Sequence, residues 1–248
     1  NLMELLIMVD ACRRASARQI TAVVPYYGYA RADRKTAGRE SIAAKLTANL
    51  LVKSGVDRVL AMDLHSAQTQ GYFDIPCDHI YGSPVLVDYL SAQDLGEVVV
   101  VSPDVGGVAR ARAFAKQMNG APLAIIDKRR TGHNMAESLT VIGDVSGRTA
   151  ILIDDMIDTG GTICSGAKLL REQGATGVIA CATHPVFSPP AIERLSVEGL
   201  FEQVVVTNSI PITSNQAFPQ LHVLSVANML GEAIWRIHEE SSVSSMFR

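Results

Sequence analysis

The stretch from Ile151 to Thr162 reads Ile-Leu-Ile-Asp-Asp-Met-Ile-Asp-Thr-Gly-Gly-Thr. The apolar, β-branched segment that leads into it, Thr149 to Ile153, is typical of a strand buried on both faces of a parallel sheet. The segment from Ile163 to Glu172 predicts a helix directly afterwards. Ligands of open parallel sheets bind beyond the carboxyl ends of the strands, so the loop lies where a ligand site is expected.

Gly160 and Gly161 give this loop the chemistry of a phosphate site. Consecutive N–H groups can turn inward around a phosphate dianion there, and the next helix would point its N-terminus at the same anion. Phosphate would repel Asp154 and Asp155, so we expect these carboxylates to accept hydrogen bonds from sugar hydroxyls. The loop lacks the Gly-Lys-Ser/Thr and G-x-G-x-x-G patterns of the common nucleotide loops. An ordinary strand–turn–helix junction is the disfavoured alternative.

Composition restricts the class of protein. The 248 residues, 48% of them hydrophobic, can bury one large core or two modest ones. A formal net charge of -3 argues against a general nucleic-acid binder. Glu4 and Asp10 interrupt the apolar start, which therefore fits neither a signal peptide nor a membrane-spanning helix. The four cysteines form no C-x-x-C pair, which favours buried thiols in a cytoplasmic protein.

Strand-like runs alternate with helical ones, which predicts an α/β protein. The expected strands are 20–24, 59–62, 98–101, 123–126, 150–153, 178–181, 204–206 and 222–224. The expected helices are 2–17, 41–53, 107–118, 163–172 and 226–240, with Gly55 ending the second.

The two halves of the chain resemble each other. Val-Val-Pro-Tyr-Tyr-Gly-Tyr-Ala-Arg-Ala-Asp-Arg, from Val23, is similar to Val-Val-Ser-Pro-Asp-Val-Gly-Gly-Val-Ala-Arg-Ala-Arg, from Val100. Met62-Asp63-Leu64-His65 occupies the place in one half that Ile153-Asp154-Asp155-Met156 occupies in the other. We interpret this as two similar parallel-sheet domains that divide near Tyr81 to Pro84.

A second candidate anion site follows the strand 98–101. Asp104, Val105, Gly106 and Gly107 repeat the order of acid and Gly-Gly before a helix. Taken alone, a tight strand-to-helix turn is about as probable as a binding site. Together with the stretch from Ile151 to Thr162, the segment favours a second phosphate site.

Two further constellations concern charge. A lone histidine after a strand is more often structural, but His65 and Asp104, at the ends of different strands, could together hold Mg²⁺. Asp127-Lys128-Arg129-Arg130 opens a polar loop expected to run to Ser138. We expect this basic loop to close over the substrate and to neutralise charge during phosphoryl transfer. A solvated charged face is the alternative.

These motifs identify a family. The stretch from Ile151 resembles the ribose 5-phosphate and diphosphate signature of the type I phosphoribosyltransferase fold. The whole chain resembles the ribose-phosphate pyrophosphokinases through Pro-Tyr-Tyr-Gly-Tyr-Ala-Arg-Ala-Asp-Arg, Met-Asp-Leu-His, Ser-Pro-Asp-Val-Gly-Gly, Asp-Lys-Arg-Arg, Asp-Asp-Met-Ile-Asp-Thr-Gly-Gly-Thr, Ala-Thr-His-Pro-Val-Phe and Ser-Ser-Met-Phe.

The resemblance implies an activity and a set of site residues. The activity is transfer of the β,γ-diphosphoryl group of MgATP to the anomeric hydroxyl of ribose 5-phosphate, giving phosphoribosyl diphosphate and AMP. The implied ligands of the 5-phosphate are Asp158, Thr159, Gly160, Gly161 and Thr162, with Asp154 and Asp155 on the ribose hydroxyls. The diphosphate would lie at Asp104, Val105, Gly106 and Gly107, Mg²⁺ at His65 and Asp104, ATP at Arg31, Asp33, Arg34 and His65, and the catalytic charges on Lys128 and Arg130.

The resemblance also implies an organisation. Residues 1–82 would form a partial N-terminal domain on the ATP side, joined by the C-terminal tail 239–248. Residues 83–238 would form the C-terminal domain, on the ribose 5-phosphate side. A homo-oligomer, a hexamer as in the family, is implied, with no nucleic-acid or membrane partner.

The sequence departs from the family in two places. Ala32 stands where many relatives have Gln, in a segment implied to contact ATP. The upstream strands and the Phe-x-x-Gly-Glu segment that relatives use for adenine are absent, so we expect an N-terminally incomplete chain with little synthetase activity by itself. Two alternatives remain open: a nucleobase phosphoribosyltransferase, and a non-catalytic regulatory subunit of the synthetase. Retention of His65, Asp104, Lys128 and Arg130 argues against the second.

Overall fold

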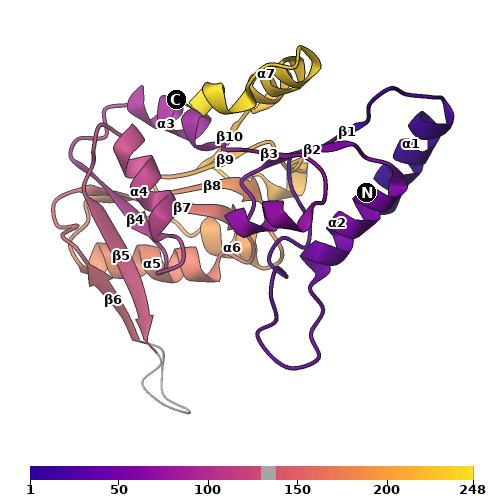
Figure 1. Cartoon of the computed structure of the whole chain (residues 1–248). Helices are drawn as coiled ribbons and strands as arrows, with labels where there is room; N and C mark the ends of the chain where they lie inside the picture. Colours follow the sequence, from indigo (N-terminus) through magenta and orange to yellow (C-terminus); the bar gives the residue numbers. More distant parts are fainter. Residues whose placement is uncertain (130–137, 248) are drawn as a thin grey trace. The chain divides into compact units, whose positions relative to one another are not determined.

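The computed structural model describes residues 1–129 and 138–247, and within these it divides the chain into two compact units. The first unit takes in Asn1–Tyr81 and the C-terminal residues from Met229 onward. The second unit is Gly82–Asn228. Figure 1 shows the helices and strands of both. In the described part of the chain, none of the helices combines the length and apolar character needed to cross a membrane.

The first unit contains a three-stranded parallel sheet in the order β1-β2-β3. Its strands are β1 (Thr21–Val24), β2 (Arg58–Met62) and β3 (Cys77–Ile80). Its helices are α1 (Leu2–Arg14), α2 (Ala43–Ser54), η1 (Ala67–Tyr72), η3 (Val243–Phe247) and most of α7 (Ala227–His238). The central strand β2 supplies buried Val59 and Ala61 to a core that Ala48 and Leu51 of α2 complete.

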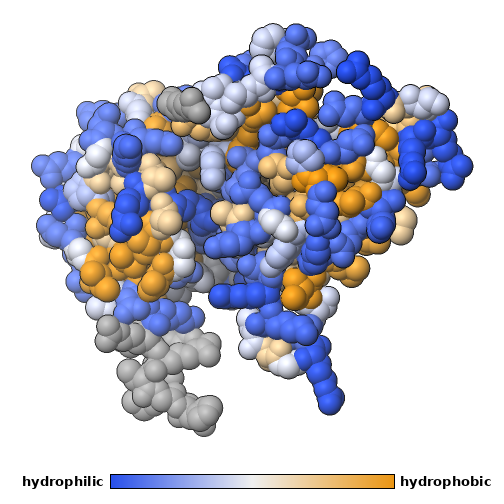
Figure 2. Space-filling model, viewed as in Figure 1, coloured by the Kyte–Doolittle hydropathy of each residue, from blue (hydrophilic) through white to orange (hydrophobic). Residues whose placement is uncertain are grey.

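The exposed side of α1 and α2 carries large apolar side chains. Met3, Ile7 and Met8 of α1 are 68%, 63% and 59% exposed, and Leu46 of α2 is 56% exposed. Figure 2 shows apolar side chains at the surface over these helices. Large exposed apolar patches are typical of association surfaces.

The second unit contains a seven-stranded sheet in the order β10-β9-β8-β7-β4-β5-β6. The strands are β4 (Val98–Ser102), β5 (Leu123–Arg129), β6 (Ser138–Ile142), β7 (Thr149–Ile157), β8 (Gly177–Pro185), β9 (Gln203–Thr207) and β10 (Leu221–Leu224). All pairs are parallel except β5 with β6.

Helices cover both faces of this sheet (Figure 1). They are α3 (Ser83–Ser91), α4 (Val108–Gln117), α5 (Gly161–Glu172) and α6 (Ala191–Leu195), and a short η2 (Ser214–Gln216) precedes β10. Alternate residues of β7 divide between two cores: Ile151 and Ile153 pack with α3 and α4, whereas Leu152 packs with α5 and α6. A strand buried on both faces must be apolar throughout, and this one is.

The structure confirms the α/β class with parallel sheets, the eight predicted strands and the five predicted helices, with small differences in their bounds. Gly55 ends α2 in a left-handed conformation with φ 112°, as expected. Two strands, β3 and β6, and two α-helices, α3 and α6, were missed, as were the short 3-10 helices. The strand β3 reads Cys-Asp-His-Ile, whose polar residues hide it, and Pro84 in the first turn of α3 marks a helix start rather than a break.

Two predicted loop segments are strands instead. The polar loop expected from Asp127 to Ser138 is wrong at its start, because β5 extends to Arg129 and pairs antiparallel with β6, with Lys128 opposite Leu139. The apolar side of β6 packs against the core through Leu139 and Val141, which outweighs the polar composition of β5. Likewise β7 continues to Ile157, because its pairing with β8 persists past Asp154. Asp154 and Asp155 therefore lie on the strand.

Candidate functional site

The predicted phosphate loop joins β7 to α5. Gly160 has φ 72°, in the left-handed region, and α5 begins at the next residue. The carbonyl of Gly160 accepts a hydrogen bond from the N–H of Cys164 at 2.9 Å, which is the first hydrogen bond of the helix. The N–H groups of the first turn, including those of Gly161 and Thr162, therefore have no partner within the helix and can bind an anion.

Arg194 of α6 supports this loop from outside it. Its Nη1 donates to the carbonyl of Thr159 at 2.9 Å and lies 3.3 Å from where a Cβ on Gly161 would be. Leu195 and Ala191 lie 3.6 and 3.7 Å from the equivalent point on Gly160. This contact could not be predicted from local sequence, because Arg194 is 35 residues away from Thr159.

Asp154 and Asp155 lie on β7, shortly before the loop, and both pair with the guanidinium of Arg110. The Nη1 atom of Arg110, on α4, is 3.1 Å from Oδ1 of Asp154 and 3.3 Å from Oδ1 of Asp155. The Asp155 side chain is only 2% exposed, and that of Asp154 is 26% exposed. Burial, followed by the Asp155 carboxylate, raises the pKa of Asp154 to about 7, and Arg110 opposes this rise. Sequence reasoning missed Arg110.

The second predicted anion loop forms a tight turn between β4 and α4. Oδ1 of Asp104 accepts the N–H of Gly107 at 2.8 Å, and its carbonyl accepts the hydroxyl of Ser102 at 2.7 Å. A Cβ on Gly107 would lie 2.8 Å from the Ser102 hydroxyl oxygen, and one on Gly106 3.2 Å from the Asp104 carboxylate. Both glycines therefore allow a close approach, and Val105 between them and Asp104 is 65% exposed.

The residues predicted for ATP lie in the first unit. Arg31, Asp33 and Arg34 follow β1 in a segment that contacts α2 and η1. The hydroxyl of Tyr72 donates to the carbonyl of Asp33, and the N–H of Ala44 donates to the carbonyl of Ala32 at 3.2 Å. Arg31 and Arg34 are exposed.

His65 is exposed just beyond the carboxyl end of β2, as the sequence predicted. The preceding Asp63 is buried with φ 39°, in the left-handed region that non-glycine residues rarely adopt. His79 of β3, which sequence reasoning missed, accepts the N–H of Leu64 through Nε2 at 3.0 Å. It thereby holds the backbone next to His65.

The residues predicted for Mg²⁺ binding and catalysis come from both compact units. His65 and Asp104 belong to different compact units. Among the described residues, no three His, Cys, Asp or Glu side chains gather as a metal site. Lys128 is exposed on β5, on a paired strand rather than in a loop. Arg130 lies outside the described residues.

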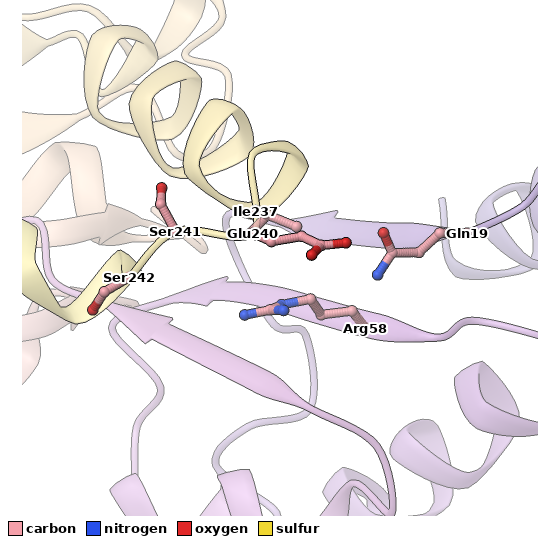
Figure 3. Close-up of a pocket in the computed structure, with 6 residues that line it drawn as sticks. All are labelled: Gln19, Arg58, Ile237, Glu240, Ser241 and Ser242. Carbon is pink, nitrogen blue, oxygen red and sulfur yellow. The ribbon is translucent and has the colours of Figure 1, made fainter.

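A cavity of about 490 Å³ lies elsewhere in the first unit. Its lining is Gln19, Arg58, Ile237, Glu240, Ser241 and Ser242. Figure 3 shows the side chains of Glu240 and Gln19 pointing toward each other, with Arg58 beside them. Arg58 is already paired with Asp78, with Nε to Oδ2 at 2.5 Å. None of the residues predicted for substrate binding lines this cavity.

Comparison with known proteins places this geometry in a family. One family model, the N-terminal domain of ribose phosphate pyrophosphokinase, matches residues 1–55, and the phosphoribosyl synthetase-associated domain matches residues 131–248. The chain is 90% identical over all 248 residues to the ribose-phosphate pyrophosphokinase of Parasynechococcus marenigrum and 77% identical to that of Synechococcus elongatus. It covers 75% of the length of each.

A solved structure agrees with these relatives. The crystal structure of phosphoribosylpyrophosphate synthetase from Mycobacterium smegmatis matches with a TM-score of 0.91 and 49% identity. The match covers 97% of this chain and 78% of that one. Neither a nucleobase phosphoribosyltransferase nor a regulatory subunit is favoured by these matches. The chain therefore belongs to the ribose-phosphate pyrophosphokinase family.

Proposed function

We propose that the protein transfers the β,γ-diphosphoryl group of ATP to the anomeric hydroxyl of ribose 5-phosphate, giving phosphoribosyl diphosphate and AMP. The observation that carries this proposal is the turn after β7, where left-handed Gly160 leads into α5. Such a turn binds a phosphate without a lysine, which suits a sugar phosphate better than the phosphates of a P-loop nucleotide. Membership of the family supports the choice of ribose 5-phosphate.

We assign the acceptor to the second unit. Asp158, Thr159, Gly160, Gly161 and Thr162 would bind the 5-phosphate through backbone N–H groups and hydroxyls. Asp154 and Asp155 would accept hydrogen bonds from the ribose hydroxyls, and the buried position of Asp155 fixes its direction. Asp104, Val105, Gly106 and Gly107 would bind the diphosphate at the N-terminus of α4.

We assign ATP to Arg31, Asp33, Arg34 and His65 of the first unit, and Mg²⁺ to His65 and Asp104. The carboxylate of Asp104 suits Mg²⁺, which prefers hard oxygen ligands and retains waters. When bound, the ion would neutralise charge on the phosphate oxygens. Lys128 and Arg130 would stabilise the transferring group by their charge, since this reaction needs positioning and electrostatics and no covalent intermediate.

The remaining proposals concern organisation. Residues 1–82 with 239–248 would form the ATP side and residues 83–238 the ribose 5-phosphate side. The exposed apolar side chains of α1 and α2 support a homo-oligomer, for which the family suggests a hexamer. All four cysteines are free and two of them are buried, which supports a cytoplasmic location.

The test follows a labelled phosphate. The purified protein, extended by the upstream segment expected from the family resemblance, is incubated with Mg²⁺, ribose 5-phosphate and ATP that carries radioactive phosphorus at the β position. We expect the label to appear in phosphoribosyl diphosphate, with one AMP formed per product. Release of labelled ADP, or consumption of phosphoribosyl diphosphate with a nucleobase instead, would contradict the proposal.

A matched pair of variants links the reaction to the site. Asp155→Asn should raise the KM for ribose 5-phosphate roughly tenfold or more, because one acceptor oxygen of the buried carboxylate becomes an NH2 donor and the negative charge is lost. Asp88→Asn, at an exposed position on α3, is the control and should leave the KM unchanged.

A further inference from the structure

Asp154 and Asp155 meet one guanidinium although they are neighbours on a strand. Successive side chains of a strand point to opposite faces, so two adjacent carboxylates should not reach the same atom. Here the Asp154 side chain folds back along its own strand, because its Oδ1 accepts the N–H of Asp155 at 2.9 Å. Both carboxylates then lie within 3.3 Å of Nη1 of Arg110.

This arrangement needs a cation. Two carboxylates that are largely removed from water repel each other, and an uncompensated buried charge is strongly destabilising. Arg110 is itself 26% exposed on its side chain, so its attraction to the pair is only partly screened by solvent. Without it, the pKa of the pair would rise further, so one carboxyl would stay protonated to higher pH and would donate a hydrogen bond instead of only accepting them.

Arg110 also connects two parts of the proposed site. It lies three residues after Gly107, whose N–H is bonded to Asp104 in the loop proposed for the diphosphate. The first turn of α4 therefore contacts that loop at its start and the Asp154–Asp155 pair at its end. A rigid helical turn between them fixes their separation.

We propose that Arg110 is a positioning residue of the ribose 5-phosphate site: it holds the Asp154 and Asp155 carboxylates together, ionised and in register with the diphosphate loop. The inference rests on the proposed function for its ligand, but not for the ion pairs themselves. Arg110 acts through the two carboxylates and needs no contact with the transferring group.

Other titratable groups lie on the elements packed against β7 and bear on any pH dependence. They are Asp104 after β4, Cys164 on α5, and Cys181 and His184 on β8. Arg110 forms one ion pair with Asp154 and one with Asp155. Burial raises the pKa of the Cys164 and Cys181 thiols, which keeps them neutral. A change in pH profile that follows Arg110 substitution is therefore assigned to the aspartates, with His184→Gln as a check.

The test compares Arg110→Gln, Arg110→Lys and the control Arg112→Gln, an exposed arginine on the same helix. At pH 7.5 we expect Arg110→Gln to raise the KM for ribose 5-phosphate roughly tenfold and to leave the KM for ATP within about twofold. This defect should lessen as the pH rises, because more of the aspartate pair then ionises. Arg110→Lys should restore more than half of the loss, and Arg112→Gln should match the parent.

Two results would overturn the inference. One is an Arg110→Gln variant whose ribose 5-phosphate KM and pH profile equal those of Arg112→Gln. The other is a lower kcat with an unchanged ribose 5-phosphate KM and an unchanged pH profile, which would indicate that Arg110 contacts the transferring group.

A second measurement covers a variant that folds poorly or a protein that does not use ribose 5-phosphate. Carbon NMR of ¹³C-labelled aspartate, without substrate, should show a higher carboxyl pKa for the pair in Arg110→Gln than in the parent, and a value near that of the parent in Arg110→Lys, which keeps the positive charge. An unchanged titration would refute the charge role directly. A raised pKa with no binding of ribose 5-phosphate by the parent would instead refute the proposed function and leave the ion-pair role intact.

Discussion

Replacing Asp154 by Asn should stabilise the second unit at neutral and alkaline pH while weakening the sugar site. Asp154 titrates at a raised pKa because it is buried beside Asp155. A carboxyl whose pKa is higher in the folded than in the unfolded chain stabilises the fold only at low pH. That stability is lost as the pH rises from the unfolded value of 3.8 to the folded value of about 7. Asparagine has no charge to bury and avoids this loss.

The magnitude follows from the two values. Each pKa unit corresponds to ~1.4 kcal/mol, so the change from 3.8 to about 7 amounts to roughly 4 kcal/mol at pH 8 and about 2 kcal/mol at pH 5. Part of this is not recovered, because Arg110 stays paired with Asp155. We expect the advantage of Asp154→Asn to grow by ~1 kcal/mol or more between pH 5 and pH 8, or roughly 2–4 °C in Tm.

The assay is urea or thermal unfolding of the parent, Asp154→Asn and the exposed control Asp88→Asn at pH 5, 6.5 and 8. Calorimetric titration with ribose 5-phosphate should show weaker binding for Asp154→Asn only. If Asp154→Asn gains no stability relative to the parent between pH 5 and pH 8, Asp154 is not a strained carboxylate and the electrostatic account of the pair is wrong.

Three further outcomes are expected. Lys128→Ala should lower kcat roughly 100-fold with the KM for ribose 5-phosphate unchanged, whereas the exposed Lys116→Ala should do neither; near-normal kcat would remove Lys128 from catalysis. His65→Ala should raise the Mg²⁺ concentration for half-maximal activity severalfold without lowering Tm, and an unaltered magnesium titration would exclude its metal role. Gly160→Ala and Gly199→Ala, at φ 72° and 74°, should each cost ~1 kcal/mol in unfolding, but only the first should weaken ribose 5-phosphate binding. Equal binding by both would dissociate the loop from the phosphate.

The sequence predicted well those strands in which every residue is apolar. Val98 to Val101 and Ile151 to Ile153 are apolar throughout because helices cover both faces of the sheet. The strand β3 was invisible for the opposite reason: three of its four residues are only partly buried, so no apolar run forms. The extension of β5 to Arg129 depends on pairing with β6, a tertiary contact that local composition does not encode.

The same division applies to the candidate site. The glycine turns could be predicted because backbone conformation and close approach are properties of a few consecutive residues. Arg110 and Arg194 could not, because their partners Asp154 and Thr159 are 44 and 35 residues distant in sequence. An arginine on an amphipathic helix carries no local mark that distinguishes an ion pair from a solvated charge.

The contacts of α6 with the phosphate loop mean that the twelve-residue signature is not a transferable module. Arg194 holds the Thr159 carbonyl, and Ala191 and Leu195 lie against Gly160. Grafting the stretch from Ile151 to Thr162 onto another α/β protein would therefore transfer its sequence and its glycines, but not the helix α6 that contacts its backbone. A working graft has to include α6 with the loop before it.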